Sequence, residues 1–224
     1  MELYHALNRG VDKRDIFLND KDRIRFVHDL YEFNDLEPAG SVYYSYRKNL
    51  PNLDLRNPDI RMPRTSIVDI HGWCVMHNHY HLLLSERVEG GISLFLRKLN
   101  VGYANYFNER YKRSGTLFQG RTKKIHIASD AHMLHILNYV HFNPLDFLKG
   151  CKDWRARRIS GTAAALAHLD GYRWSSYLDY VGKKNFPSVI TTDLFNDIFK
   201  NYEKEVREYL RDLDLTDVKP FLLE

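Results

Sequence analysis

Cysteine is scarce in this chain of 224 residues: it has only Cys74 and Cys151, and neither belongs to a CxxC pair. This argues against a disulfide scaffold or a zinc ribbon and is typical of a reducing compartment. Long apolar runs are absent too, so the sequence predicts no membrane span, and its N-terminus lacks the apolar region of a signal peptide. We therefore expect a cytosolic protein.

Internal repeats and low-complexity tracts are likewise missing, and the composition is that of a folded chain. Hydrophobic residues make up 44% of it and aromatic residues 13%, enough to bury a core in one large domain or in one domain with an appendage. Lys and Arg number 33 against 29 Asp and Glu, a net charge of +4. Such an excess is weak evidence for an anionic partner, so the positions of the charges matter more.

What is present is a succession of strand-like and helix-like hydrophobic patterns, interrupted between about residues 36 and 64. This interruption holds four of the seven prolines and indicates an excursion from the core, with 41–50 as an edge strand or hairpin arm. The remaining patterns predict a compact α+β fold, in which helices pack on one face of an antiparallel sheet. Strands are expected at 2–10, 65–76, 79–86 and within 116–129, and helices at 19–35, 90–115, 129–144 and about 192–213.

Three histidines, His77, His79 and His81, stand at alternating positions, where the runs 65–76 and 79–86 either pair or form one bent strand. On a strand, alternation would point all three rings to one face. A lone histidine is usually a surface residue or a satisfied core residue, but three on one face repel one another once protonated, unless a metal or an anion intervenes. The pattern therefore favours a metal site, with a further ligand from elsewhere in the fold.

A row of polar residues, His135, Tyr139 and Asn143, runs along the helix predicted at 129–144, because residues four apart share a face. The amide oxygen of Asn143 is a hard ligand that suits Mg²⁺ or Mn²⁺, and the phenol of Tyr139 would stand beside that metal. A phenolate so placed can attack a phosphate and form a covalent phosphotyrosine. Such an intermediate conserves the energy of the phosphodiester bond for rejoining, which is typical of strand transfer and not of simple hydrolysis. An alternative that the helix alone favours equally is that Asn143 only caps the helix and Tyr139 packs in the core. The opposite, apolar side of the helix would face the sheet through Met133, Leu134, Leu137 and Val140.

Several motifs occur together in one order: CVMHNHYHLLL at 74–84, YANYFNERYKRSGTLFQGRTKKIHI at 103–127, YVHFNPL at 139–145 and YRWSSY at 172–177. With them the chain resembles the single-tyrosine transposases that carry a histidine-hydrophobe-histidine (HUH) motif, and most closely the REP-associated tyrosine transposases. The resemblance runs from Tyr4 to about Gly182, with 36–64 as an apparent insertion. It implies a ferredoxin-like α+β catalytic domain at about 1–150, and a C-terminal extension at 151–224 packed on the same domain.

The resemblance also implies an activity. Enzymes of this family cleave single-stranded DNA next to a hairpin with the help of a divalent metal, link a tyrosine to the 5′ phosphate and leave a free 3′-OH. Here the nucleophile falls on Tyr139 and the ligands of Mg²⁺ or Mn²⁺ fall on His79, His81 and Asn143.

Two more histidines are candidate accessory residues of this site. His77 stands where the family commonly has proline, and it would be an extra ligand, a phosphate contact or a harmless replacement. His135 lies one turn before Tyr139 on the same predicted helix face.

Basic residues cluster in places that flank the predicted site in sequence. Each cluster alone is more often a solvated face, but aromatic residues interleave with all of them, as in proteins that bind single strands and hairpins. We expect DNA binding with an affinity that falls steeply with salt. The clusters are Arg110, Lys112 and Arg113; Arg121, Lys123 and Lys124; and Arg155, Arg157 and Arg158, and the interleaved aromatic residues are Tyr106, Tyr111, Phe118 and Trp154.

We therefore expect a metal-dependent DNA nickase and strand transferase that acts on single-stranded hairpin DNA in the bacterial cytosol. Two alternatives stay open: a hairpin-binding protein that does not use catalysis, and a metal-dependent nuclease without a covalent step. The oligomeric state is also open, because the last predicted helix would either cover the core or form a dimer contact, which gives a monomer or a homodimer.

Overall fold

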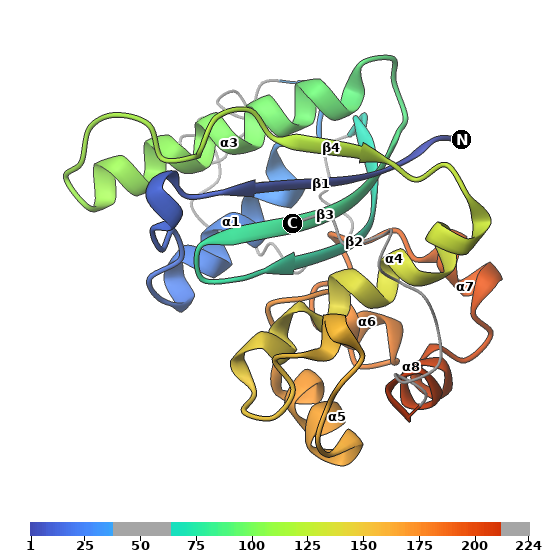
Figure 1. The fold of residues 1–224 in the computed structure, drawn as a ribbon. Coiled ribbons are helices and arrows are strands. Elements are labelled where there is room, and N and C mark those ends of the chain that lie inside the picture. Colours follow the sequence, from blue (N-terminus) through green and yellow to red (C-terminus); the bar gives the residue numbers. More distant parts are fainter. Residues whose placement is uncertain (38–63, 212–224) are drawn as a thin grey trace, which may run out of the picture.

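The computed structural model describes residues 1–37 and 64–211, which form a four-stranded antiparallel sheet with helices on both sides (Figure 1). Along the chain, the elements of the sheet region are β1 (Leu3–Arg9), η1 (Val11–Lys13), α1 (Asp20–Glu32), β2 (Val68–Val75), β3 (His79–Glu86), α3 (Gly91–Arg110) and β4 (Lys123–His126). The strand order in the sheet is β2-β3-β1-β4. This connectivity and order confirm the predicted α+β class and its ferredoxin-like sheet, but helices cover both faces of the sheet and not one face as predicted.

The strand pairing decides between the two arrangements that the sequence allows around His77. β2 and β3 pair antiparallel, so the two runs form a hairpin and not one bent strand. β1 lies between β3 and β4 and pairs antiparallel with both. α1 begins where the Asn19 side chain accepts hydrogen bonds from the backbone N–H groups of Lys21 and Asp22, donors that the helix itself leaves open.

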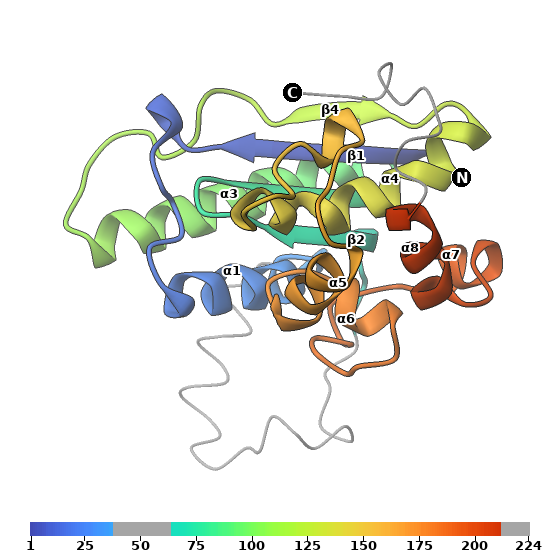
Figure 2. The same cartoon turned by 60° about the horizontal axis from the view of Figure 1, so that its bottom comes forward.

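The chain after the sheet folds into helices that pack on the side opposite α1 and α3 (Figure 2). Their apolar residues form one cluster with Leu3 of β1 and Leu83 of β3, so the sheet is covered on both faces. None of the described helices is long and apolar enough to cross a membrane. The elements are α4 (Asp130–Phe142), η3 (Asn143–Phe147), η4 (Trp154–Ala156), α5 (Thr162–Gly171), α6 (Tyr177–Tyr180), α7 (Asp193–Ile198) and α8 (Tyr202–Arg211).

The single amphipathic helix expected at about 192–213 is wrong. The structure has two shorter helices there, α7 and α8, because the chain is extended at Phe199 (φ -112°, ψ 97°). Asn201 then starts a new helix, since its side chain accepts a hydrogen bond from the backbone N–H of Lys204. The predicted end at Leu213 lies outside the described residues.

The segment predicted as an excursion leaves and rejoins the fold at one place. Residues 38–63 lie outside the described part of the chain, and with them the edge strand or hairpin arm expected at 41–50. At the two ends, the Leu36 N–H donates to the Thr65 carbonyl at 3.0 Å, and the Asp35 carboxylate accepts from the Thr65 N–H at 3.4 Å. The two ends are therefore neighbours.

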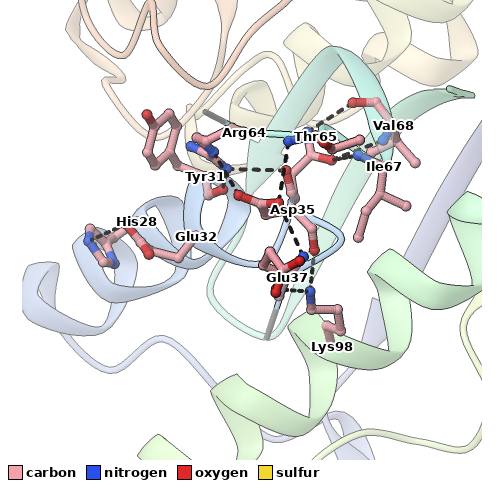
Figure 3. Close-up of polar contacts among 11 residues, drawn as sticks. His28, Tyr31, Glu32, Asp35, Glu37, Arg64, Thr65, Ile67, Val68 and Lys98 are labelled. Atoms are coloured by element: carbon pink, nitrogen blue, oxygen red, sulfur yellow. Dashed lines mark hydrogen bonds and ion pairs between the residues drawn. The ribbon is translucent and has the colours of Figure 1, made fainter. Parts of the chain in front are cut away.

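A cluster of charged contacts anchors these ends to α1 and α3 (Figure 3). Arg64 lies over the Tyr31 ring, 3.6 Å from its centroid, and pairs with the Asp35 carboxylate at 3.5 Å. Lys98 of α3 donates to the backbone carbonyls of Asp35 and Glu37, the latter at 2.9 Å. Residues of the described core therefore hold both ends in place.

Candidate active site

His79 and His81 lie on β3 with their rings on the α4 side of the sheet, 4.9 Å apart between centroids. His77 is not on the strand: it lies in the turn between β2 and β3 and is exposed. The prediction that all three rings share one strand face is therefore wrong for His77. The physical reason is the turn itself, in which the His77 carbonyl accepts hydrogen bonds from the Ile16 and Phe17 N–H groups, at 3.0 Å each, in place of a strand partner.

A fourth histidine, His5 of β1, belongs to the same cluster, although it is not among the predicted site residues. Its Nε2 atom lies 2.9 Å from Nδ1 of His81, and both side chains are fully buried. Burial lowers the pKa of both rings, that of His5 to about 3, so both are neutral at pH 7. The signal that would have found it is a histidine between Leu3 and Leu7, which interrupts an otherwise apolar row on that strand.

His79 is held by its neighbour Asn78, whose Oδ1 atom lies 2.6 Å from His79 Nδ1. This contact places the proton on Nδ1, because an amide oxygen only accepts, and it leaves a lone pair on Nε2. Arg9 stands opposite His79 in the β1–β3 pair. Burial, with Arg9 and Arg155 nearby, lowers the pKa of His79 to about 4.

Tyr139 reaches this cluster from α4, as the predicted site requires. Its ring lies edge-on to the rings of His5 and His81, with centroids 5.7 Å and 5.9 Å away. The Arg155 guanidinium lies over the Tyr139 ring, 5.7 Å from its centroid, and the Trp154 ring packs against Tyr139 with centroids 5.6 Å apart. The structure thus brings a helix residue and a strand residue together that are far apart in the sequence.

Asn143 is fully buried one turn after Tyr139. Its Nδ2 donates to the Tyr139 carbonyl at 2.8 Å, and its Oδ1 accepts from Arg155 at 2.6 Å. Arg155 also pairs with Asp146 at 2.6 Å. The amide oxygen predicted as a metal ligand is therefore bound to a guanidinium, which also contacts the Tyr139 ring.

The two imidazoles of β3 fit a divalent metal. The Nε2 atoms of His79 and His81 are buried and have no hydrogen-bond partner among the described residues. Such nitrogens have a lone pair available to coordinate a metal. Within 1–37 and 64–211, no group of three or more His, Cys, Asp or Glu side chains could hold a metal ion. A full coordination shell would need Asn143, water or a substrate phosphate, and Asn143 would have to exchange Arg155 for the metal.

The other residues predicted on α4 divide between buried and exposed positions. His135 lies against the ring of Tyr209 on α8, with centroids 5.8 Å apart. Leu137 and Val140 are buried as expected, but Leu134 is 46% exposed, so its predicted packing on the sheet is wrong. The reason is that the first turn of α4 lies near the surface: the helix is buried without interruption only from Ile136 onward, and Leu134 precedes that residue.

A buried hydrogen-bond network ties α4 to β2 and α8. The His141 ring bonds to Ser176 Oγ at 2.7 Å and to the Tyr202 hydroxyl at 2.8 Å, and the Trp73 N–H donates to Ser176 Oγ at 2.9 Å. Burial lowers the pKa of His141 to about 3. These contacts give the 172–177 motif a structural role, which is to fix the helix that carries the tyrosine against the sheet.

The basic residues predicted to bind DNA lie in three places on the fold. Each place is at the surface, although Arg155 turns inward to Asn143 and Asp146. Arg110, Lys112 and Arg113 lie at and after the end of α3, Arg121, Lys123 and Lys124 before and on the edge strand β4, and Arg155, Arg157 and Arg158 in and after η4.

The aromatic residues interleaved with these clusters are engaged in the fold. The hydroxyls of Tyr106 and Tyr111 donate to the buried Asp22 carboxylate at 3.0 Å and 2.7 Å. Trp154 is 5% exposed, and Phe118 packs against the core. These contacts hold the neighbouring loops in place, while Tyr106, Tyr111 and Phe118 stay half-exposed.

Comparison with known proteins locates a family match in the middle of the chain. Residues 61–143, which include β2, β3 and α4, match the model of the family described as "Transposase IS200 like". No curated protein matches the chain. Among solved structures, the chain is similar to one described as "Structure of the REP associates tyrosine transposase bound to a REP hairpin", with 13% identity, a TM-score of 0.44 and 86% of each chain covered.

Proposed function

Because residues 61–143 match the IS200-like transposase family, we propose that the chain nicks single-stranded DNA beside a hairpin and transfers the cut strand. One observation carries the proposal: the Tyr139 ring lies 5.9 Å from that of His81, with Arg155 over it at 5.7 Å. A nucleophile, a pair of metal-ligating rings and a cation are thus next to one another. The bacterial cytosol is the compartment that this proposal assigns.

In the proposed reaction, the phenol oxygen of Tyr139 attacks a DNA phosphorus. A new O–P bond forms and the bond from phosphorus to the 3′ oxygen breaks. The phenol proton ends on the 3′ oxygen, so the products are a 5′-phosphotyrosine and a free 3′-OH. Attack by a 3′-OH reverses these steps and rejoins DNA. The Arg155 guanidinium favours the phenolate and the charge that develops on the phosphate.

His79 and His81 would hold Mg²⁺ or Mn²⁺ through their Nε2 atoms, with Asn143 as a third ligand. When bound, such a metal polarises the scissile phosphate and stabilises its developing charge. A metal on His81 Nε2 requires the proton on Nδ1, where His5 Nε2 would accept it, and Asn78 accepts the corresponding proton of His79.

We propose that hairpin DNA follows the basic residues at the end of α3 and along β4. Lys112 and Lys123 are exposed, so they are suited to phosphate contacts that carry no sequence information. Lys112→Ala and Lys123→Ala should each lower the slope of log affinity against log salt by about one. Binding titrations at several salt concentrations measure this, and an affinity that does not change with salt would contradict the proposal.

The domain organisation is also a proposal. Residues 1–150 would form the catalytic domain, 36–64 an insertion, and 151–224 an extension on the same body. The neighbouring ends at Leu36 and Thr65, and the contact of Ser176 with His141, support this division.

The experiment that tests the function mixes the protein, Mg²⁺ or Mn²⁺ and labelled hairpin oligonucleotides, and resolves the products on a denaturing gel. We expect a covalent protein–DNA adduct that Tyr139→Phe and EDTA both abolish. Tyr177→Phe is the matched control, because Tyr177 is a buried tyrosine of the same apolar cluster and should keep the adduct.

Two other outcomes favour the alternative functions. Cleavage without an adduct that survives in Tyr139→Phe would indicate a metal-dependent nuclease with no covalent step. Tight binding without any cleavage would indicate a hairpin-binding protein.

A further inference from the structure

An exposed pair of stacked rings lies at the turn that precedes His79. His77 stacks on Phe147 of η3, with ring centroids 4.3 Å apart and 18° between the planes. Phe147 is 39% exposed, and His77 is exposed as well. A flat aromatic surface that faces solvent can accept a planar partner by stacking.

Polar contacts fix the rings behind this pair. Tyr172 lies 6.0 Å from Phe147, and its hydroxyl donates to the Val75 carbonyl at 2.7 Å. His168 stacks on Tyr172 at 6.3 Å and hydrogen-bonds to the Pro144 carbonyl at 2.9 Å. Because these rings are already ordered, a partner that stacks on the exposed end would lose little free energy in ordering them.

Positive charge lies on both sides of the turn. The Asn78 side chain donates to the Lys13 carbonyl at 3.0 Å, which holds η1 against the turn. Lys13 is exposed, and its neighbour Arg14 pairs with Asp12 at 3.7 Å. Arg9 stands opposite His79 and lowers its pKa, so its charge is close to the site. A strand that passes His77 would meet cations suited to its phosphates.

We propose that the outer face of His77 stacks on an unpaired base of the substrate strand, next to the phosphate that Tyr139 attacks. This rests on the proposed function, because the strand must enter the site for a neighbouring base to reach His77. The occupant is a nucleobase, since the surface is a single flat ring flanked by positive charge and not an extended apolar patch. His77 then takes part in substrate binding, while His79 and His81 serve the metal.

Equilibrium binding of a hairpin oligonucleotide with an unpaired extension tests this. His77→Ala should weaken binding by about 5- to 150-fold, the range for loss of one stacked base. His77→Tyr keeps a ring and should restore most of the affinity. His28→Ala is the matched control, because His28 is an exposed histidine of α1 that lies 3.6 Å from the Glu32 carboxylate, away from the proposed path of the DNA.

Abasic substitutions in the extension identify the base. At one position the wild type should lose affinity while His77→Ala loses nothing further. Equal affinity of the wild type and His77→Ala, or losses that add at every position, would overturn the inference. If an adduct forms on Tyr139 but the effects of His77→Ala and the abasic positions simply add, the proposed function stands and the stacking surface is wrong. If those effects do not add at one position but no adduct forms, the stacking surface is supported and the covalent chemistry is contradicted.

Discussion

The strand β3 contributes to two faces of the sheet that differ in chemistry. Toward α1 and α3 its side chains include Tyr80, Leu82 and Leu84, all fully buried in an apolar core. Toward α4 they include His79 and His81, whose Nε2 atoms are buried without a partner among the described residues. Burial of an unpaired polar atom costs free energy, so stability alone does not favour the α4 face. Under the proposed function, the α4 face adds binding and chemistry to the packing that both faces share.

We expect the largest contrast from matched substitutions on the two faces. His79→Ala should reduce adduct formation by more than about 100-fold, because even groups that only orient a ligand contribute about 10- to 100-fold. Leu82→Ala should leave the folded protein active but lower its free energy of unfolding by about 2–5 kcal/mol through the cavity it creates. Adduct gels and urea unfolding measure the two quantities. An active His79→Ala protein would remove the distinction between the faces.

The next contrast lies within the α4 face, between a ligand and the residue that orients it. His5→Leu should weaken Mn²⁺ binding by about 10- to 100-fold, because His81 loses the acceptor that fixes its Nδ1 proton. His5→Gln offers an amide oxygen to that proton and should recover part of the affinity. Calorimetric titration of the DNA-free protein measures it, and equal affinities for the Leu and Gln variants would contradict the role.

Acid should weaken the fold through the same face. The pKa of His5 is lowered to about 3, that of His79 to about 4 and that of His141 to about 3, against about 6.5 in the unfolded chain. From pH 6.5 to 4 the unfolded chain binds protons that the folded chain does not, so stability falls with the pH. The loss is roughly 1.4 kcal/mol per pH unit for each such histidine.

One carboxyl on the α1 side opposes this dependence. Burial raises the pKa of Asp29 to about 7, so its contribution to stability rises as the pH falls toward the unfolded value. With three histidines against this group, we still expect a net loss on acidification. Urea unfolding at pH 7 and pH 5 in EDTA measures it, and a more stable protein at pH 5 would show that the histidines are not buried as neutral rings.

The smallest effect should come from residues 38–63, which lie outside the described part of the chain. Replacing residues 38–63 by a short glycine-serine linker should change the free energy of unfolding by less than about 1 kcal/mol, since loop closure depends weakly on length. The contacts of Arg64 and Lys98 remain in such a variant. Loss of a cooperative unfolding transition would show that the segment belongs to the core.

Hydrophobic periodicity predicts the order of strands and helices around the sheet, because burial of one face is a local constraint on the sequence. The alternation leaves His77, His79 and His81 as equal candidates, and it is the resemblance that singles out Tyr139, His79 and His81 before their contact is known. Periodicity fails at His77, where a turn ends the alternation, and at Phe199, where an extended residue divides one amphipathic pattern into two helices.

Contacts between distant segments lie beyond such patterns. The bond of His5 to His81 depends on the register of β1 on β3, and that of Arg155 to Asn143 depends on how η4 returns to the end of α4. Each of these contacts joins residues of two different elements, so the sequence of one element alone does not reveal it. Local sequence therefore indicates the candidate reactive groups more readily than the residues that contact and orient them.

The covalent product itself gives the most direct test of the central claim. The protein–DNA adduct is isolated after reaction with a hairpin oligonucleotide, digested with protease and nuclease, and mapped by mass spectrometry. We predict a nucleotide joined through its 5′ phosphate to Tyr139, and a 3′-OH on the released fragment. A nucleotide on any other residue, or a cut strand with no modified peptide, would contradict the assignment of Tyr139 as the nucleophile.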